Sequence, residues 1–220
     1  IIKLNNDLHI SSNEDIIIKN GATLTIEKGT EVNLGDNSGI EVEDGKLVAN
    51  GTPSDPIVFT SSRTGSGIKF SSSSYSYRQN SLEYCEIENQ SNAVVVTGGN
   101  VLLDIDNCYI HNNSYSGVKV SGSNSGVDIT SSTIDHSNIG VYATDGSSID
   151  LRHRNDIINN NYTGLQVTYN STIDAGASNS SIYDSYYFAI SRGRTINAYA
   201  CWWGTPNPTD SKFRESGSYY

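Results

Sequence analysis

Five carboxylates recur at nearly equal intervals in the sequence, each directly after an apolar residue that is expected to point inward. They are Glu83, Asp104, Asp128, Asp150 and Asp174, and Asn197 follows at the same interval. Stacked on one face of a repeating fold, neighbouring carboxylates would lie about 5 Å apart and repel by about 1 kcal/mol in water. A divalent cation would relieve this repulsion, and Ca²⁺ fits the oxygen ligands. The alternative is a solvated acidic face that Lys119 and Arg152 balance.

Tyrosine dominates the aromatic residues, with 14 Tyr against 4 Phe and 2 Trp. A ring with a polar tip suits a boundary with water. Tyr115, Tyr162 and Tyr187 each stand two residues before a small residue that opens a period. Tyr75 and Tyr77 lie in an insertion between two strands. We predict that these five rings bind the flat faces of a polysaccharide; the alternative is that they cover strand ends and edges.

The elements that would position these side chains follow from a repeat of about 24 residues. A small residue followed by an apolar–any–apolar pattern returns along nearly the whole chain, with its first apolar residue at positions 16, 40, 68, 94, 118, 141, 165 and 190. A second apolar column contains Leu24, Leu47, Leu82, Leu103, Val127, Ile149, Ile173 and Ile196. A third contains Val32, Val58, Ile87, Ile110, Ile134, Ile158 and Ile182.

Three short alternating strands per period, separated by Gly, Asn and Ser, are typical of one turn of a parallel β-helix. Amphipathic helices are excluded because no window holds a helical apolar stripe for three turns. An antiparallel sandwich would not require the period to persist.

Three segments resemble the pectin-lyase-like family of right-handed parallel β-helix repeat proteins. They are GATLTIEKGT at 21–30, GTPSDPIVFT at 51–60 and CWWGTPNP at 201–208. The resemblance implies a right-handed coil and a module of a secreted or surface protein. It implies no single activity, because the family includes lyases, hydrolases, epimerases and many non-enzymes.

We therefore predict one all-β domain, a single-stranded right-handed parallel β-helix (solenoid) of about eight coils over residues 15–204. Residues 1–14 are expected to form an N-terminal cap. The coils are expected to end at Trp202-Trp203-Gly204, and residues 205–220 to form a tail.

Two further sets are expected to be structural. Cys85 and Cys108 should point inward in adjacent coils, about 5 Å apart at Cα, either as a disulfide or as two buried free thiols. The residues expected to stack at a turn, where Asn tolerates a left-handed backbone, are Asn89, Asn112 and Asn160, with His136 and Asp184 in the intervening rows.

Catalysis receives little support from the motifs. The resemblance implies that a hydrolase would carry an Asp-Asp pair and a His-Gly, which are missing, and only Arg192-Gly193-Arg194 resembles a basic pair. The four histidines, His9, His111, His136 and His153, are scattered. The short coils leave no long loops to form a cleft. These features favour a non-catalytic module that binds polysaccharide or mediates adhesion; a small polysaccharide lyase for uronate-containing glycans and a structural spacer are the alternatives.

The formal net charge of −10 argues against a nucleic-acid-binding surface. No apolar run approaches the length of a membrane span. The chain contains no Met, so we interpret it as part of a larger secreted or cell-surface protein with neighbouring domains. The expected partner is a polysaccharide or cell-surface glycan, and Ca²⁺ is the one cofactor considered.

Overall fold

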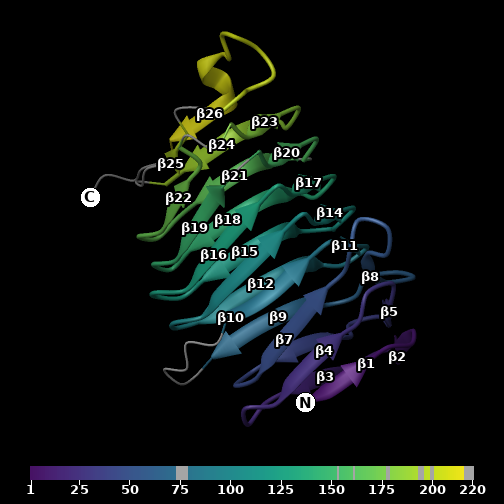
Figure 1. Ribbon diagram of the computed structural model, residues 1–220. Helices are drawn as coiled ribbons and strands as arrows, with labels where there is room; N and C mark the ends of the chain where they lie inside the picture. The colour runs from purple at the N-terminus through teal and green to yellow at the C-terminus, as the bar shows by residue number, and fades with distance from the viewer. Residues whose placement is uncertain are drawn as a thin grey trace.

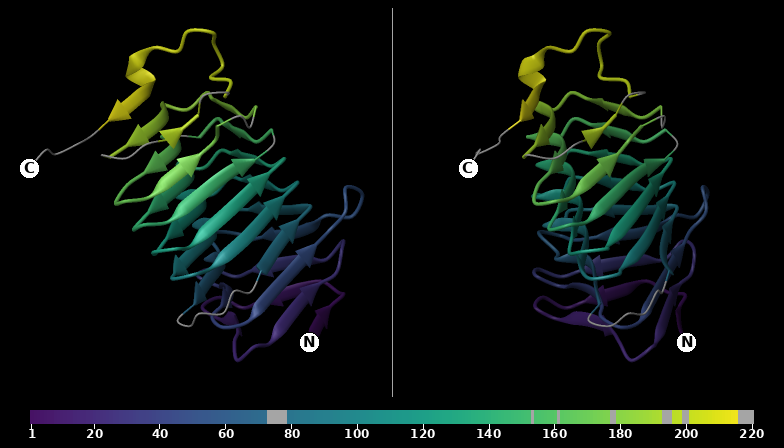
Figure 2. Two further views of the ribbon diagram at one scale, coloured as in Figure 1. Left: turned by 60° about the vertical axis from the view of Figure 1, so that its left-hand side comes forward. Right: turned by 90° about the vertical axis from the view of Figure 1, so that its left-hand side faces the viewer.

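The computed structural model describes residues 1–72, 79–152, 154–160, 162–176, 179–192, 196–198 and 201–215. Figure 1 shows that these residues form a stack of coils, which the chain follows in one direction from the N-terminus to the C-terminus. Each coil contributes strands to three parallel sheets, and the other two views show the same stack from the side (Figure 2). The predicted all-β parallel solenoid of about eight coils is therefore confirmed.

Sheet A carries the second apolar column and the predicted acidic residues. Its nine described strands are β1 Ile2–Leu4, β4 Thr23–Ile26, β7 Lys46–Asn50, β10 Gln79–Glu83, β13 Leu102–Asp106, β16 Gly126–Thr130, β19 Ser148–Arg152, β22 Thr172–Asp174 and β25 Ile196–Asn197.

Sheet B carries the third apolar column. Its eight described strands are β2 Leu8–Ile10, β5 Glu31–Leu34, β8 Ile57–Thr60, β11 Cys85–Glu88, β14 Tyr109–His111, β17 Thr133–Asp135, β20 Asp156–Ile158 and β23 Ser181–Tyr183.

Sheet C carries the first apolar column. Its nine described strands are β3 Asp15–Ile18, β6 Gly39–Val42, β9 Gly67–Ser72, β12 Asn92–Gly98, β15 Ser116–Ser121, β18 Ile139–Thr144, β21 Thr163–Val167, β24 Tyr187–Ser191 and β26 Phe213–Glu215. A 3₁₀ helix, η1 (Asp210–Lys212), precedes β26. No helix in the described part of the chain is long and apolar enough to cross a membrane.

The core consists of continuous files of apolar side chains, one residue per coil. Val118 pairs with Val141, and Val141 pairs with Leu165 in the next coil. All three side chains are fully buried. The file continues to Ala189, so the prediction of Ile190 as its next member is wrong by one residue. Both residues are apolar, and polarity alone does not choose between them.

The third column contains two errors of the same kind. Val32 pairs with Phe59 rather than Val58, and Ile134 pairs with Ile157 rather than Ile158. In each case two adjacent apolar residues compete, and the backbone register places the other one inward.

The second column is wrong at Leu82. Leu82 pairs with Ala49 and Ile105, in the next inward file of the same sheet. The position level with Leu103 is filled by Asn80, which is 4% exposed. Its Oδ1 accepts a hydrogen bond from the backbone N–H of Leu47 at 2.9 Å. A buried amide with a backbone partner therefore replaces a leucine in this file.

The turn between sheets B and C has the expected left-handed residues, with one correction. Positive φ angles occur at Asn89, Asn112, His136, Asn159 and Asp184. Asn159 therefore takes the place predicted for Asn160. Asn160 is buried, and its Oδ1 accepts a hydrogen bond from the N–H of Ser137 at 3.1 Å. Asn160 thus links two coils through its side chain.

Cys85 and Cys108 are buried free thiols. The Cys85 Sγ donates to the carbonyl oxygen of Ala49 at 3.3 Å, and the Cys108 Sγ donates to that of Leu82 at 3.4 Å. The contact with Cys108 and burial hold the pKa of the Cys85 thiol well above its ordinary value. A protonated thiol in this position packs as a small apolar group.

The two ends are built from strands. Within residues 1–14, which were expected to form a cap, β1 pairs with β4 and β2 pairs with β5. The segment is therefore part of a first coil. At the other end, β26 adds to β24 as the last strand of sheet C, and Figure 1 shows this segment, in yellow, over the final coils. The tail expected at 205–220 thus contains a strand of the solenoid.

Candidate functional site

The acidic residues of sheet A form a straight outward file, which we call the ladder: Asp104, Asp128, Asp150 and Asp174. Register pairing joins each to the next, and Asp174 pairs with Asn197. Buried residues flank each position along the strands, so these side chains point away from the core. The ladder was predicted correctly for these four residues.

Glu83 does not belong to the ladder. It pairs with Asp106, whereas Asp104 pairs with Ser81. The chain between β7 and β10 is long, since Ala49 pairs with Leu82, and the expected alignment of Leu82 with Leu103 differs by two residues from the observed one with Ile105. A shift of two keeps the side chain on the same face, which is why the apolar pattern does not reveal it.

Lys119 also lies away from the ladder. It belongs to β15 of sheet C, and its Nζ lies 5.7 Å from the ring centre of Tyr142. The ladder belongs to sheet A, so Lys119 does not balance it.

The ladder carboxylates are spaced along the solenoid axis. Among the described residues, no three of them bring one ligand atom each within 4.8 Å of one another. The Oδ1 of Asp174 accepts hydrogen bonds from the N–H of Gly176 at 2.9 Å and from Nδ2 of Asn197 at 3.0 Å. Ca²⁺ binding by the ladder, and by Glu83, stays a prediction.

The tyrosines form a different group from the expected one. Register places Tyr115, Asn138 and Tyr162 at one level of successive coils. The next member is Tyr186, because Tyr187 pairs with Thr163 inside the strand. The one-residue error at Tyr187 follows from the error at Ile190. Tyr75 and Tyr77 lie outside the described residues.

Three of these rings contact one another near the C-terminal end, and we call them the tyrosine cluster: Tyr162, Tyr186 and Tyr187. The rings of Tyr162 and Tyr186 are stacked, with centroids 6.3 Å apart and planes at 9°. Tyr187 meets both edge-on, at 5.5 Å and 4.7 Å. The guanidinium carbon of Arg214 lies 5.8 Å from the ring centre of Tyr187. Tyr186 is 64% exposed, so the cluster presents a ring face to solvent.

An open pocket of about 570 Å³ adjoins the tyrosine cluster at Tyr186. It is lined by Tyr183, Asp184, Ser185, Tyr186, Phe188, Trp203, Gly204, Thr205 and Lys212. The rings of Trp203 and Phe188 stack at 6.1 Å. The Lys212 Nζ donates to the carbonyl oxygens of Ser185 and Tyr186, which ties η1 to the last coils. Aromatic walls with a few polar groups are typical of a ligand site.

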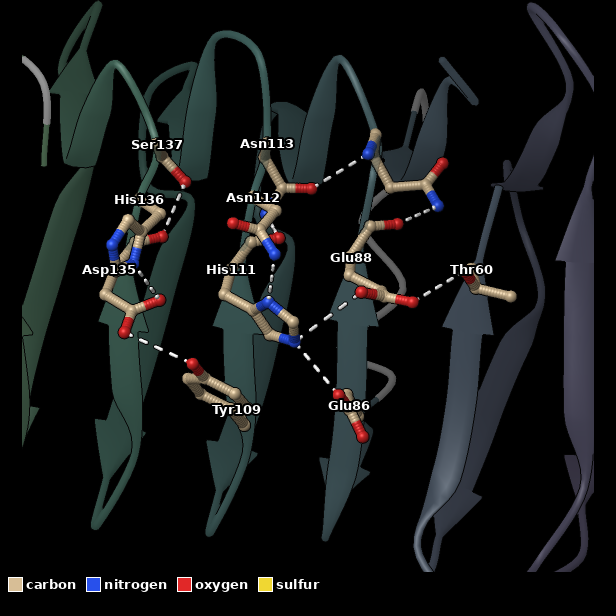
Figure 3. A network of polar contacts seen from close by, with 11 residues as sticks. Thr60, Glu86, Glu88, Tyr109, His111, Asn112, Asn113, Asp135, His136 and Ser137 are labelled. Carbon is tan, nitrogen blue, oxygen red and sulfur yellow. Dashed lines mark hydrogen bonds and ion pairs between the residues drawn. The ribbon is translucent and has the colours of Figure 1, made fainter. Parts of the chain in front are cut away.

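A second polar group lies on the outer face of sheet B, which Figure 3 shows from close by. Glu86 and Glu88 alternate along β11 and therefore point to the same side. His111 pairs with Glu88 in the next coil. The His111 Nε2 lies 3.0 Å from Oε1 of Glu86 and 3.9 Å from Oε2 of Glu88. We call these three residues the histidine–glutamate cluster.

Neighbouring side chains hold this cluster in place. The ring of Tyr109 stacks on that of His111, with centroids 4.0 Å apart, and its hydroxyl donates to Oδ2 of Asp135 at 3.2 Å. Partial burial, the nearby charge of Asp135 and that of the two glutamates raise the pKa of Tyr109 above its usual value. The phenol therefore remains a hydrogen-bond donor well above neutral pH.

The histidine–glutamate cluster was not predicted, because the four histidines are scattered in the sequence and were interpreted one by one. A signal was present: Glu88, His111 and Asp135 follow one another at steps of 23 and 24 residues. Register pairing brings them into one row. The repeat length, applied to the outward positions of sheet B, would have found them.

The described residues form a parallel β-solenoid with clusters of polar and aromatic side chains on its surface. The chain belongs to the right-handed β-helix family, because residues 66–201, more than half of it, match the family model described as the right handed beta helix region. Residues 2–68 match the model of the pectate-lyase like beta helix domain. No curated protein and no solved structure matches the chain. The family resemblance of the sequence is thus confirmed for the fold.

Proposed function

We propose that this protein is a non-catalytic, extracellular module that binds polysaccharide at the C-terminal end of the solenoid. The observation that carries the proposal is the joined surface of the tyrosine cluster and the adjoining pocket. Stacked Tyr162 and Tyr186 provide ring faces, and the pocket continues this surface with Trp203 and Phe188. A sugar ring has apolar faces and a polar edge, so it suits aromatic walls with polar groups between them.

The rigidity of the site supports binding. Tyr162 directly precedes β21, and Tyr187 is the first residue of β24. These two strands pair over several residues. Lys212 fastens the η1 segment to the carbonyl groups of the last turn. Rings held in this way lose little conformational freedom when a ligand stacks on them.

The lining of the pocket supports binding rather than hydrolysis. Among the described residues that line the pocket, Asp184 is the one carboxylate. Glycoside hydrolysis usually needs two carboxylates, one on each side of the scissile bond. A glycan held here would be retained without a pair of groups to cleave it.

The proposal is tested by affinity electrophoresis of the purified protein in gels that contain soluble β-glucan, xylan, polygalacturonate or alginate. We expect at least one polysaccharide to retard the wild-type protein. Tyr186→Ala should weaken that binding roughly three- to tenfold, because it removes the most exposed ring of the cluster.

Tyr169→Ala is the matched control. Tyr169 is 68% exposed and lies outside the tyrosine cluster, so its loss should leave the retardation unchanged. Absence of retardation by every polysaccharide, or equal weakening by both substitutions, would contradict the proposal. Sustained release of unsaturated products from polygalacturonate or alginate would instead favour the lyase alternative.

A further inference from the structure

The histidine–glutamate cluster holds three potential metal ligands, two carboxylates and one imidazole, at short range. Among the described residues, Glu86, Glu88 and His111 form the group in which one ligand atom of each lies within 4.8 Å of the others. The three side chains come from two paired strands, β11 and β14, of a continuous sheet. Their relative positions are therefore set by backbone register and do not depend on a loop.

The distances match a small metal ion. Tetrahedral ligands with bonds of about 2.0 Å lie about 3.3 Å from one another. The His111 Nε2 is 3.0 Å from Glu86 Oε1 and 3.9 Å from Glu88 Oε2, so the two separations bracket this value. The third separation, between the ligand atoms of the two glutamates, is within 4.8 Å.

A second layer of contacts orients two of the ligands, as Figure 3 shows. The Thr60 hydroxyl donates to Oε1 of Glu88 at 2.8 Å, which leaves Oε2 directed to His111. Asn112 Nδ2 lies 2.8 Å from Nδ1 of His111, and the stacked Tyr109 ring fixes the plane of the imidazole. A metal-binding histidine commonly donates its second ring N–H to a neighbouring acceptor, and the Asn112 amide would fill that role through its oxygen.

The charge around the cluster also favours a cation. Asp135 lies in the row next to His111, is 6% exposed, and its Oδ1 accepts no hydrogen bond. Its one ion-pair contact among the described residues is with Nδ1 of His136, at 3.2 Å. The His136 ring carries a charge only when it is protonated. Within the described part of the chain, no Lys or Arg pairs with Asp135, Glu86 or Glu88. Three carboxylates thus lie around the imidazole of His111, with no permanent cation among their described partners.

We propose that Glu86, Glu88 and His111 bind one Zn²⁺ ion. An imidazole ligand favours zinc over calcium and magnesium, which prefer oxygen alone. Glu86 is 37% exposed, so one side of the ion faces solvent and water completes its coordination. With the ion on Nε2, the His111 proton would lie on Nδ1, and the Asn112 amide oxygen would accept a hydrogen bond from it.

The test is isothermal titration calorimetry of the whole protein with Zn²⁺ as the added metal. We expect one ion per chain, and much weaker binding of Ca²⁺ under the same conditions. His111→Gln and Glu88→Gln should each weaken zinc binding about 100-fold, and Thr60→Val about tenfold, because the threonine acts through Glu88. Glu86→Gln provides a variant at an exposed position in case His111→Gln fails to fold.

His9→Gln is the matched control, because His9 is an exposed histidine in β2 of the same sheet. The His9→Gln protein should bind zinc with the same affinity as the wild type. Absence of zinc binding, or binding that Glu86→Gln and Glu88→Gln leave unchanged, would overturn the proposal. Tyr186→Ala should not alter zinc binding, so this result is independent of the polysaccharide site.

Discussion

The middle of the solenoid and its C-terminal end follow the same repeat, yet they present different surfaces. In the middle, Gly117, Gly140 and Gly164 occupy one level of successive coils. A Cβ atom on Gly140 would lie 2.7 Å from the carbonyl oxygen of Gly164 and equally close to Ile157. At the same level in the next coil stands Phe188, which packs against Trp203 and Phe213.

This difference shows how coil stacking limits the residues a solenoid can use. Between two coils, the backbones approach closely and leave room for glycine at this level. At the end of the stack, β24 pairs with the short strand β26, and large rings pack together over the apolar files. The same rings, where they reach the surface, provide the proposed polysaccharide site.

The largest expected effect is a difference in the free energy of unfolding between a substitution in the middle coils and one at the C-terminal end. Ile134→Ala removes a fully buried side chain from the middle and should lower the free energy of unfolding by about 2–5 kcal/mol. Phe213→Ala removes a ring that is 38% exposed at the end and should cost only about 1 kcal/mol. Urea unfolding followed by circular dichroism measures both. A larger loss for Phe213→Ala would contradict the view that the middle carries most of the stability.

An intermediate effect concerns the ladder in the middle. Asp128 lies between Asp104 and Asp150, so Asp128→Asn should remove like-charge repulsion and raise the free energy of unfolding by up to about 1 kcal/mol at low salt. Salt should reduce the gain. Asp174→Asn is the matched control; Asp174 has a carboxylate neighbour, Asp150, on one side only and Asn197 on the other, so its replacement should stabilise the protein less. Destabilisation by Asp128→Asn would instead indicate a bound cation or an essential partner.

The smallest expected effect concerns an ordinary ion pair. The hydrogen bond from Lys69 lowers the pKa of Glu41, against the opposing effect of burial. Because the pKa of Glu41 is lower in the folded state, its ion pair stabilises the protein at pH values above the ordinary pKa of 4.5. This stabilisation is lost as the pH falls through the lowered pKa. Lys69→Met should therefore reduce the free energy of unfolding at neutral pH by less than about 1 kcal/mol.

The pH series distinguishes charge from packing in this pair. As the pH falls through the lowered pKa of Glu41, its carboxylate becomes protonated, so the difference in free energy of unfolding between wild type and Lys69→Met should shrink. Urea unfolding across a series from neutral to acidic pH measures it. A difference that stays constant with pH would show that the lysine acts through its aliphatic chain.

The sequence predicts most of the fold because the repeat is strict in the middle coils. Val118, Val141 and Leu165 are each the same number of residues into their periods, and the structure stacks them as expected. The ladder from Asp104 to Asp174 follows from the same regularity. Where coil lengths are equal, alternation along the strand is sufficient to place a side chain.

The remaining placements depend on backbone register that polarity does not determine. Phe59 and Val58, or Ile157 and Ile158, are adjacent and equally apolar. The error at the C-terminal end had a functional consequence, because it assigned Tyr187 to the file that Tyr186 occupies. The histidine–glutamate cluster required the repeat to be applied to outward positions, where sequence gives no apolar pattern.

The most direct test of the proposed function is a crystal structure of the protein with an oligosaccharide from the polysaccharide that binds it best. We predict sugar density against the rings of Tyr186 and Trp203, with the chain extending into the pocket beside Lys212. Density along Asp104, Asp128 and Asp150, with none at the aromatic surface, would contradict the account.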